Sequence, residues 1–134
     1  MRVLLDTHIF LGWITDDARL AAPLRSALGA SGVSLFWSVA STWEVAVKHA
    51  IGRLPLAEPP GPLLARHREL NRVELVMIGE DHALLAAELP RHHDDPFDRL
   101  LVAQAKLEGM RLATADARVR EYDVPLLPPR RPTG

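Results

Sequence analysis

Five short apolar runs recur along the chain, and most of them lack the alternating polar positions of a strand with one wet face. They occupy residues 3–5, 33–37, 73–77, 111–113 and 124–127. Continuous hydrophobicity over such short lengths is typical of strands covered on both sides, as in a parallel sheet. The pattern therefore predicts a buried, mostly parallel sheet.

The segments between these runs carry apolar residues at helical spacing. Helices are predicted at residues 18–28, 41–51 and 96–108, with shorter ones at 63–70 and 81–89. In the second helix one apolar stripe contains Trp43, Val47, Ala50 and Ile51. Helices that alternate with parallel strands cover both faces of a sheet, so the predicted fold class is α/β in one domain.

The predicted domain spans residues 1–127, and residues 128–134 form a Pro/Arg-rich tail with nothing apolar to bury. Such a tail is expected to be extended or disordered. Its two arginines leave two alternatives open, a solvated end or a contact with RNA or a partner. The Pro/Gly cluster around residues 55–62 is interpreted as a loop between helices.

The amino-acid composition constrains the cellular location and the partners of the protein. The 134 residues match the length of one domain with a real core, and they contain no cysteine. The absence of cysteine excludes disulfides and thiolate sites and favours a cytoplasmic location, and no segment is long and apolar enough to predict a membrane helix. The 16 Lys and Arg nearly balance 17 Asp and Glu, for a net charge of −1. A polyanionic partner must therefore meet a local basic patch.

Acidic residues follow two of the predicted strands directly. Asp6 ends the first run beside Thr7, and Asp116 follows the fourth run together with Thr114. Ligands of open α/β sheets bind beyond the carboxyl ends of the strands, so both acids are expected at one edge. Helix capping or a turn is the alternative role for each of them.

Two further acids lie at predicted helices. Glu44 lies next to the apolar stripe, where an unpaired charge would be costly, and a salt bridge with Lys48 is its alternative role. Asp95 and Pro96 make a good helix start, which leaves Asp98 free for a second role. Four acids from four elements at one edge fit a hard cation such as Mg²⁺.

Other site chemistries lack their motifs. The six histidines show no zinc-ligand spacing, and the sequence contains no glycine-rich phosphate loop and no Gly-x-Ser-x-Gly elbow. Zinc is therefore disfavoured, and nucleotide-cofactor and serine-hydrolase functions lose their main support.

Four motifs follow one another along the chain: Leu4-Leu5-Asp6-Thr7-His8, Ser41-Thr42-Trp43-Glu44 with Lys48 and Gly52-Arg53-Leu54, Asp95-Pro96-Phe97-Asp98-Arg99, and Thr114-Ala115-Asp116. With these motifs, the sequence resembles the PIN-domain ribonucleases of the VapC toxin type over nearly its whole length. This resemblance implies a three-layer α/β/α fold, an Mg²⁺-dependent or Mn²⁺-dependent endoribonuclease, a VapB-type antitoxin and a homodimer.

By the same resemblance, the catalytic and metal-binding quartet falls on Asp6, Glu44, Asp98 and Asp116. Thr7 and Thr114 are expected to support these acids. The expected contacts with RNA phosphates are Lys48, Arg53 and Arg99.

Two alternative functions remain at this point. A catalytically idle PIN-like module would bind RNA or protein in the same groove. A phosphatase of the haloacid dehalogenase kind would use Asp6 as nucleophile, but its second aspartate is replaced here by His8. The sequence also leaves open whether Trp13, Leu20 and Trp43 are core residues or partner contacts.

Overall fold

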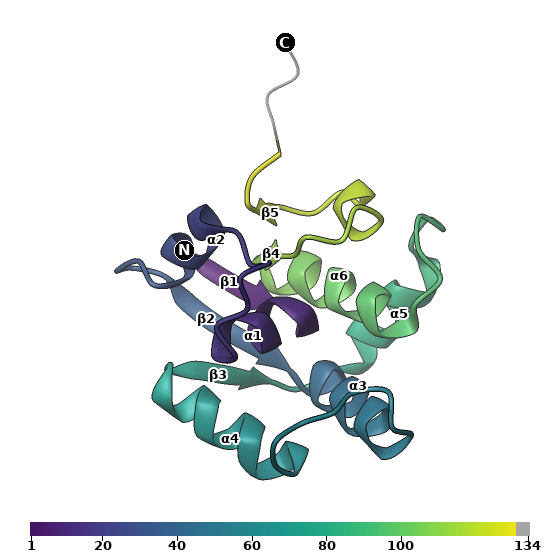
Figure 1. Cartoon of the computed structure of the whole chain (residues 1–134). Helices are drawn as coiled ribbons and strands as arrows, with labels where there is room; N and C mark the ends of the chain where they lie inside the picture. Colours follow the sequence, from purple (N-terminus) through teal and green to yellow (C-terminus); the bar gives the residue numbers. More distant parts are fainter. Residues whose placement is uncertain (131–134) are drawn as a thin grey trace.

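The fold is built on a parallel sheet of five strands, which lie one below another in Figure 1. The computed structural model describes residues 1–130. The strands are β1 (Arg2–Leu5), β2 (Ser34–Ser38), β3 (Val73–Val76), β4 (Arg111–Ala113) and β5 (Leu126–Leu127). Their spatial order is β3-β2-β1-β4-β5, and every neighbouring pair is parallel. The predicted parallel sheet is confirmed.

The central strand β1 is covered on both faces. Its partners on either side pair Leu4 with Phe36 and with Leu112. Side chains alternate across a strand, and accordingly Val3 and Leu5 belong to one core cluster and Leu4 to the other. All three are fully buried, which explains why the run has no polar positions.

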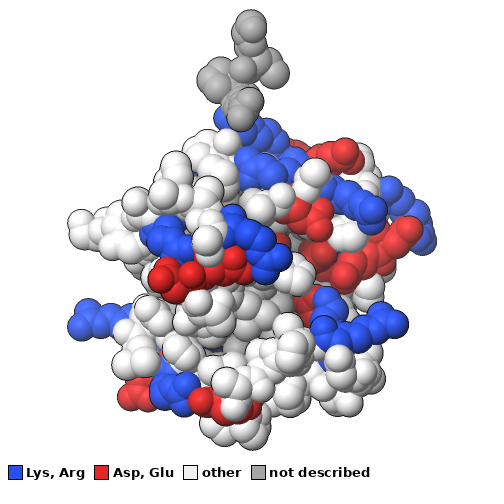
Figure 2. Space-filling view, in the orientation of Figure 1, with Lys and Arg blue, Asp and Glu red and all other residues white. Residues whose placement is uncertain are grey.

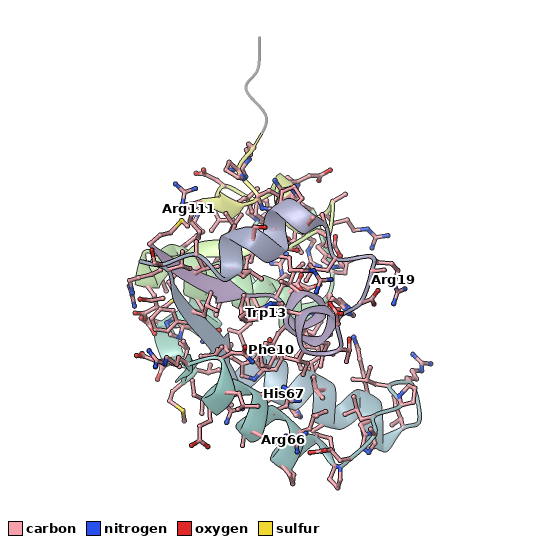
Figure 3. All side chains as sticks on the ribbon, turned by 60° about the vertical axis from the view of Figure 1, so that its left-hand side comes forward. Phe10, Trp13, Arg19, Arg66, His67 and Arg111 are labelled. Carbon is pink, nitrogen blue, oxygen red and sulfur yellow. The ribbon has the colours of Figure 1, made fainter. Side chains whose placement is uncertain are left out.

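Helices form the two outer layers. They are α1 (Thr7–Ile14), α2 (Ala22–Leu28), α3 (Val39–Ala50), α4 (Pro60–Leu70), α5 (Glu80–Glu88), α6 (Pro96–Glu108) and the 3₁₀ turn η1 (Val119–Glu121). Helices α1 to α4 contribute core residues on one face of the sheet, and α5, α6 and η1 contribute them on the other. Phe10 on α1, labelled in Figure 3, packs its ring against Trp37 of β2. The fold is therefore a three-layer α/β/α arrangement.

Three helix predictions need correction. Helix α1 was not predicted, because its eight residues are nearly all apolar and show no polar face. The helix predicted from residue 18 begins at Ala22, because Pro23 is tolerated only in the first turn. Helix α4 begins at Pro60 instead of residue 63, so part of the predicted loop is its proline-containing first turn.

The apolar stripe of α3 faces solvent. Trp43 and Ile51 are 60% and 61% exposed, whereas Ser41, Glu44 and Val45 are buried. The helix thus packs on the molecule through Val45 and the polar side chains of Ser41 and Glu44. Of the residues left open by the sequence, Leu20 is core, Trp13 is partly buried against the core and Trp43 is exposed.

The start of the predicted tail contacts the domain. Arg130 donates hydrogen bonds from its guanidinium to the carbonyl oxygens of Arg120, Tyr122 and Val124. Residues 131–134, the remainder of the predicted tail, lie outside the described residues. None of the described helices is long and apolar enough to cross a membrane.

Candidate active site

The strand order creates a crevice at the carboxyl ends of β1 and β4. From β1 the chain continues to β2 and β3 on one flank of β1, and β4 and β5 are added later on its other flank. Connections leave the two central strands in opposite directions at such a point, which is where open α/β sheets bind ligands. Asp6 follows β1, Thr114 and Asp116 follow β4, and α3 after β2 brings in Glu44.

Asp6 uses its two carboxylate oxygens differently. Oδ1 accepts hydrogen bonds from the backbone N–H groups of His8 at 2.7 Å and Ile9 at 3.4 Å, which caps α1. Oδ2 accepts a hydrogen bond from Thr114 Oγ1 at 2.7 Å. Burial raises the pKa of Asp6, against the opposing effect of these hydrogen bonds. Capping and a place in the site therefore coexist at this residue.

Glu44 is a buried carboxylate with two side-chain partners. Thr7 Oγ1 donates to Oε1 at 2.6 Å, and Lys48 Nζ donates to Oε2 at 2.5 Å. The alternative salt bridge with Lys48 is thus present, although Glu44 itself is only 2% exposed. Burial works to lower the pKa of Lys48, but the hydrogen bond and charge of Glu44 raise it overall, helped by Asp95 and Asp98.

Asp98 lies in the first turn of α6. The predicted helix start is confirmed, because Asp95 Oδ1 accepts hydrogen bonds from the backbone N–H groups of Phe97 and Asp98. Burial raises the pKa of Asp98 to about 7, and the negative charges of Asp95, Asp6 and Glu44 add to this shift. Carboxylates that are clustered in this way favour the binding of a cation.

Asp116 forms the open side of the site. Its Oδ1 accepts hydrogen bonds from the backbone N–H groups of Arg118 at 2.8 Å and Val119 at 3.4 Å. Its own N–H donates to Thr114 Oγ1 at 3.1 Å. The side chain is 37% exposed, and Oδ2 lies 3.8 Å from His93 Nε2. The turn role and a place in the site again coexist.

These contacts link all four acids into one cluster. Thr7 connects the start of α1 to Glu44, and Thr114 connects the end of β4 to Asp6. His93, which the sequence analysis did not single out, bridges Asp98 and Asp116. One ligand atom from each of these last three residues lies within 4.8 Å of the others, so the two carboxylates are close enough to share a cation with His93 beside them.

A second group with metal-like composition does not behave as a site. It combines Asp81, His82 and Glu108. His82 Nδ1 accepts a hydrogen bond from the backbone N–H of Gly79 at 2.8 Å, so the ring proton is on Nε2, which donates to Glu108 at 2.8 Å. Neither nitrogen then offers a lone pair to a metal. The group ties α5 to α6.

Arg99 has a structural role in this fold. It is 8% exposed, and its two Nη atoms donate to carbonyl oxygens at the end of α5 and in the following loop. These acceptors are Ala86, Ala87, Leu89, Pro90 and His93. The expected contact of Arg99 with RNA phosphates does not fit this burial, because its guanidinium is already bound to these carbonyl oxygens. Lys48 lies at the acids, and Arg53 is exposed.

Comparison with known proteins places the chain in a family. The PIN domain family model matches residues 3–125. Ribonuclease VapC22 of Mycobacterium tuberculosis is 33% identical over 124 residues, which cover 92% of this chain and 93% of the relative.

Solved structures share the fold at lower sequence identity. A chain of VapBC2 from Rickettsia felis, bound to a promoter DNA fragment, aligns with a TM-score of 0.67 at 17% identity, covering 94% of this chain and 97% of that chain. A chain of VapBC-1 from nontypeable Haemophilus influenzae has a TM-score of 0.63 at 16% identity, covering 94% and 96%. The family match covers both central strands and all four acids, and we conclude that this chain belongs to the PIN domain family.

Proposed function

We propose that this protein is a metal-dependent endoribonuclease and the toxin of a VapBC-type toxin–antitoxin pair in the cytoplasm. The observation that supports the activity is the cluster of Asp6, Glu44, Asp98 and Asp116 at the β1/β4 crevice. Thr7 and Thr114 donate hydrogen bonds to Glu44 and Asp6, and His93 lies between Asp98 and Asp116. The similarity to Ribonuclease VapC22 supports RNA as the substrate.

The donor set fits Mg²⁺ or Mn²⁺. Oxygen ligands predominate, which hard divalent cations prefer, and the pKa of Asp98 is raised by burial and then by the negative charges of Asp95, Asp6 and Glu44, which a cation would offset. A bound divalent ion would activate water and neutralise charge on the phosphate during phosphodiester hydrolysis. Asp6, Asp98 and Asp116 are the proposed ligands.

Glu44 is proposed to act beside them as a further ligand or to orient the attacking water. Thr7 and Lys48 hold its two oxygens in place, so the carboxylate is oriented before substrate binds. Lys48 and Arg53 are the proposed contacts for RNA phosphates. Basic and acidic side chains are interspersed on the face seen in Figure 2, so such contacts would act locally.

An apolar groove offers a binding place for the antitoxin. Its volume is about 1270 Å³, and it lies between α1, α2 and α4. Its lining includes Leu20, Leu24 and Leu63, and it reaches Thr114 beside the acids. We propose that an apolar antitoxin segment binds here, next to the acids. Leu63→Glu is expected to weaken toxin–antitoxin binding in calorimetry, whereas Leu70→Glu on the exposed side of α4 is the control.

The exposed stripe of α3 is the proposed homodimer surface. Trp43, Val47 and Ile51 form it, and the Trp43 ring packs edge-on against Phe97 with centroids 5.2 Å apart. Exposed apolar surface of this kind marks interaction sites. Sedimentation is expected to show a dimer that Trp43→Glu dissociates, and a wild-type monomer at every concentration would contradict this assignment.

Cleavage of a structured RNA pool tests the activity directly. The purified protein is incubated with Mg²⁺ or with EDTA, beside Asp98→Asn and the control Asp94→Asn, whose side chain is 88% exposed outside the site. We expect cleavage by wild type and Asp94→Asn with metal only. A folded, metal-binding wild type that cleaves none of these RNAs would favour the idle binding module. The phosphatase alternative predicts instead a phosphorylated Asp6.

A further inference from the structure

We propose that His93 is a positioning residue of the metal site, in which it holds one oxygen of Asp98 and leaves the other free for the cation. His93 Nε2 lies 2.9 Å from Asp98 Oδ2, and the histidine side chain is 11% exposed. This inference rests on the proposed role of Asp98 as a metal ligand. In this role a histidine from a loop orients the carboxylate of Asp98.

The backbone of His93 is fixed from two elements. Its N–H donates to Tyr122 Oη at 3.1 Å, and its carbonyl oxygen accepts from Tyr122 Oη and from Arg99 Nη1, both at 3.2 Å. Tyr122 follows η1, and Arg99 belongs to α6. Because both backbone groups are held, the imidazole is oriented toward the acids before any ligand binds. These backbone contacts explain how a segment without regular secondary structure holds the His93 ring close to Asp98.

The surroundings of His93 Nδ1 decide which ring nitrogen carries the proton. His93 Nδ1 is buried and has no hydrogen-bond partner among residues 1–130. A proton on Nδ1 would leave a buried N–H unpaired at a cost of about 1–3 kcal/mol, whereas a bare lone pair is tolerated more readily. We therefore place the proton on Nε2, where it is donated to Asp98. Nε2 then has no lone pair for a metal.

Asp98 is consequently divided between two tasks. Oδ2 accepts the hydrogen bond from His93, and within residues 1–130 Oδ1 accepts no hydrogen bond and remains available to the cation. Residues that orient a metal ligand in this way typically change metal affinity 10-fold to 100-fold when they are removed. The effect should be the same for Mg²⁺ and Mn²⁺, because an oxygen of Asp98, and no nitrogen, contacts the ion.

Calorimetric titration of the metal-free full chain with Mg²⁺ and with Mn²⁺ tests this role. His93→Leu removes the N–H donor but keeps much of the side-chain volume, and His93→Ala removes both. His93→Gln restores a side-chain N–H. The matched control is His92→Ala, since His92 packs on Tyr122 and lies 3.5 Å from Glu121. Circular dichroism verifies the fold of each variant.

We expect the donorless variants that fold to bind both metals about 10-fold to 100-fold more weakly, and His93→Gln to recover most of the affinity. Unchanged affinity in a folded donorless variant would overturn the inference while leaving the metal site intact. A loss for Mn²⁺ alone that His93→Gln does not rescue would make His93 a direct ligand and also overturn it. No metal binding by wild type would contradict the proposed function itself.

Discussion

The raised pKa of Asp98 predicts that Asp98→Asn stabilises the metal-free protein above neutral pH. An unfolded aspartate titrates near 3.8, whereas the pKa of Asp98 in the fold is about 7. A raised carboxyl pKa means that stability is complete below pH 3.8 and is lost as pH rises through about 7. The ionised Asp98 therefore destabilises the metal-free fold at pH 8.

The size of this effect follows from the shift. One pKa unit corresponds to about 1.4 kcal/mol, so a shift of roughly three units costs about 4 kcal/mol once Asp98 is fully ionised. About 2–3 kcal/mol of this cost develops between pH 5 and pH 8. Asn keeps the size of the side chain and an oxygen that accepts from His93 while removing the charge. The variant should thus gain about 2–4 kcal/mol over wild type at pH 8.

Urea unfolding in EDTA at pH 5 and pH 8 measures this difference. Comparison between variants cancels the titration of groups that do not interact with Asp98, and the control Asp94→Asn, at an exposed position, should stay within about 0.5 kcal/mol of wild type. With saturating Mg²⁺ the order should reverse, because the Asp98 carboxylate of wild type binds the ion more strongly than a neutral amide does. Equal stability of wild type and Asp98→Asn at pH 8 in EDTA would refute the reasoning.

Three further predictions concern the groups around the site. Arg99→Ala should lower the free energy of unfolding by about 3–5 kcal/mol, because buried carbonyls such as Ala86 O lose their donor; a loss below about 1 kcal/mol in urea would contradict this role. Thr114→Val should cost about 1–3 kcal/mol and raise the pKa of Asp6 further, which unfolding and carboxyl NMR titrations can check. Mg²⁺ affinity should rise between pH 6 and pH 8 as Asp98 loses its proton, and calorimetry showing a flat profile would count against that linkage.

Local chemistry made the helix around Asp98 predictable. The bounds of α6 agree with the predicted residues 96–108, because Asp95 caps its start, Pro96 fits its first turn and Gly109 adopts a left-handed conformation at its end. Each of these signals depends only on a few neighbouring residues. The missed α1 has the same kind of cap at Asp6, but its apolar sequence concealed its helical period.

The sequence alone determined the α/β class, the places of the strands and the expectation that Asp6, Glu44, Asp98 and Asp116 share one sheet edge. These depend on hydrophobic runs and on the common direction of parallel strands. Whether the four acids approach closely depended on contacts between residues up to 108 positions apart, such as Thr114 with Asp6.

Tertiary structure alone decided three other features: the exposed side of α3, the burial of Arg99 and the place of His93 beside the acids. Helical periodicity shows which residues share a face but not which face meets the sheet, so the stripe of α3 could be assigned only after packing. The position of His93 depends on Tyr122 and Arg99 holding its loop, and no local pattern encodes such contacts between distant elements.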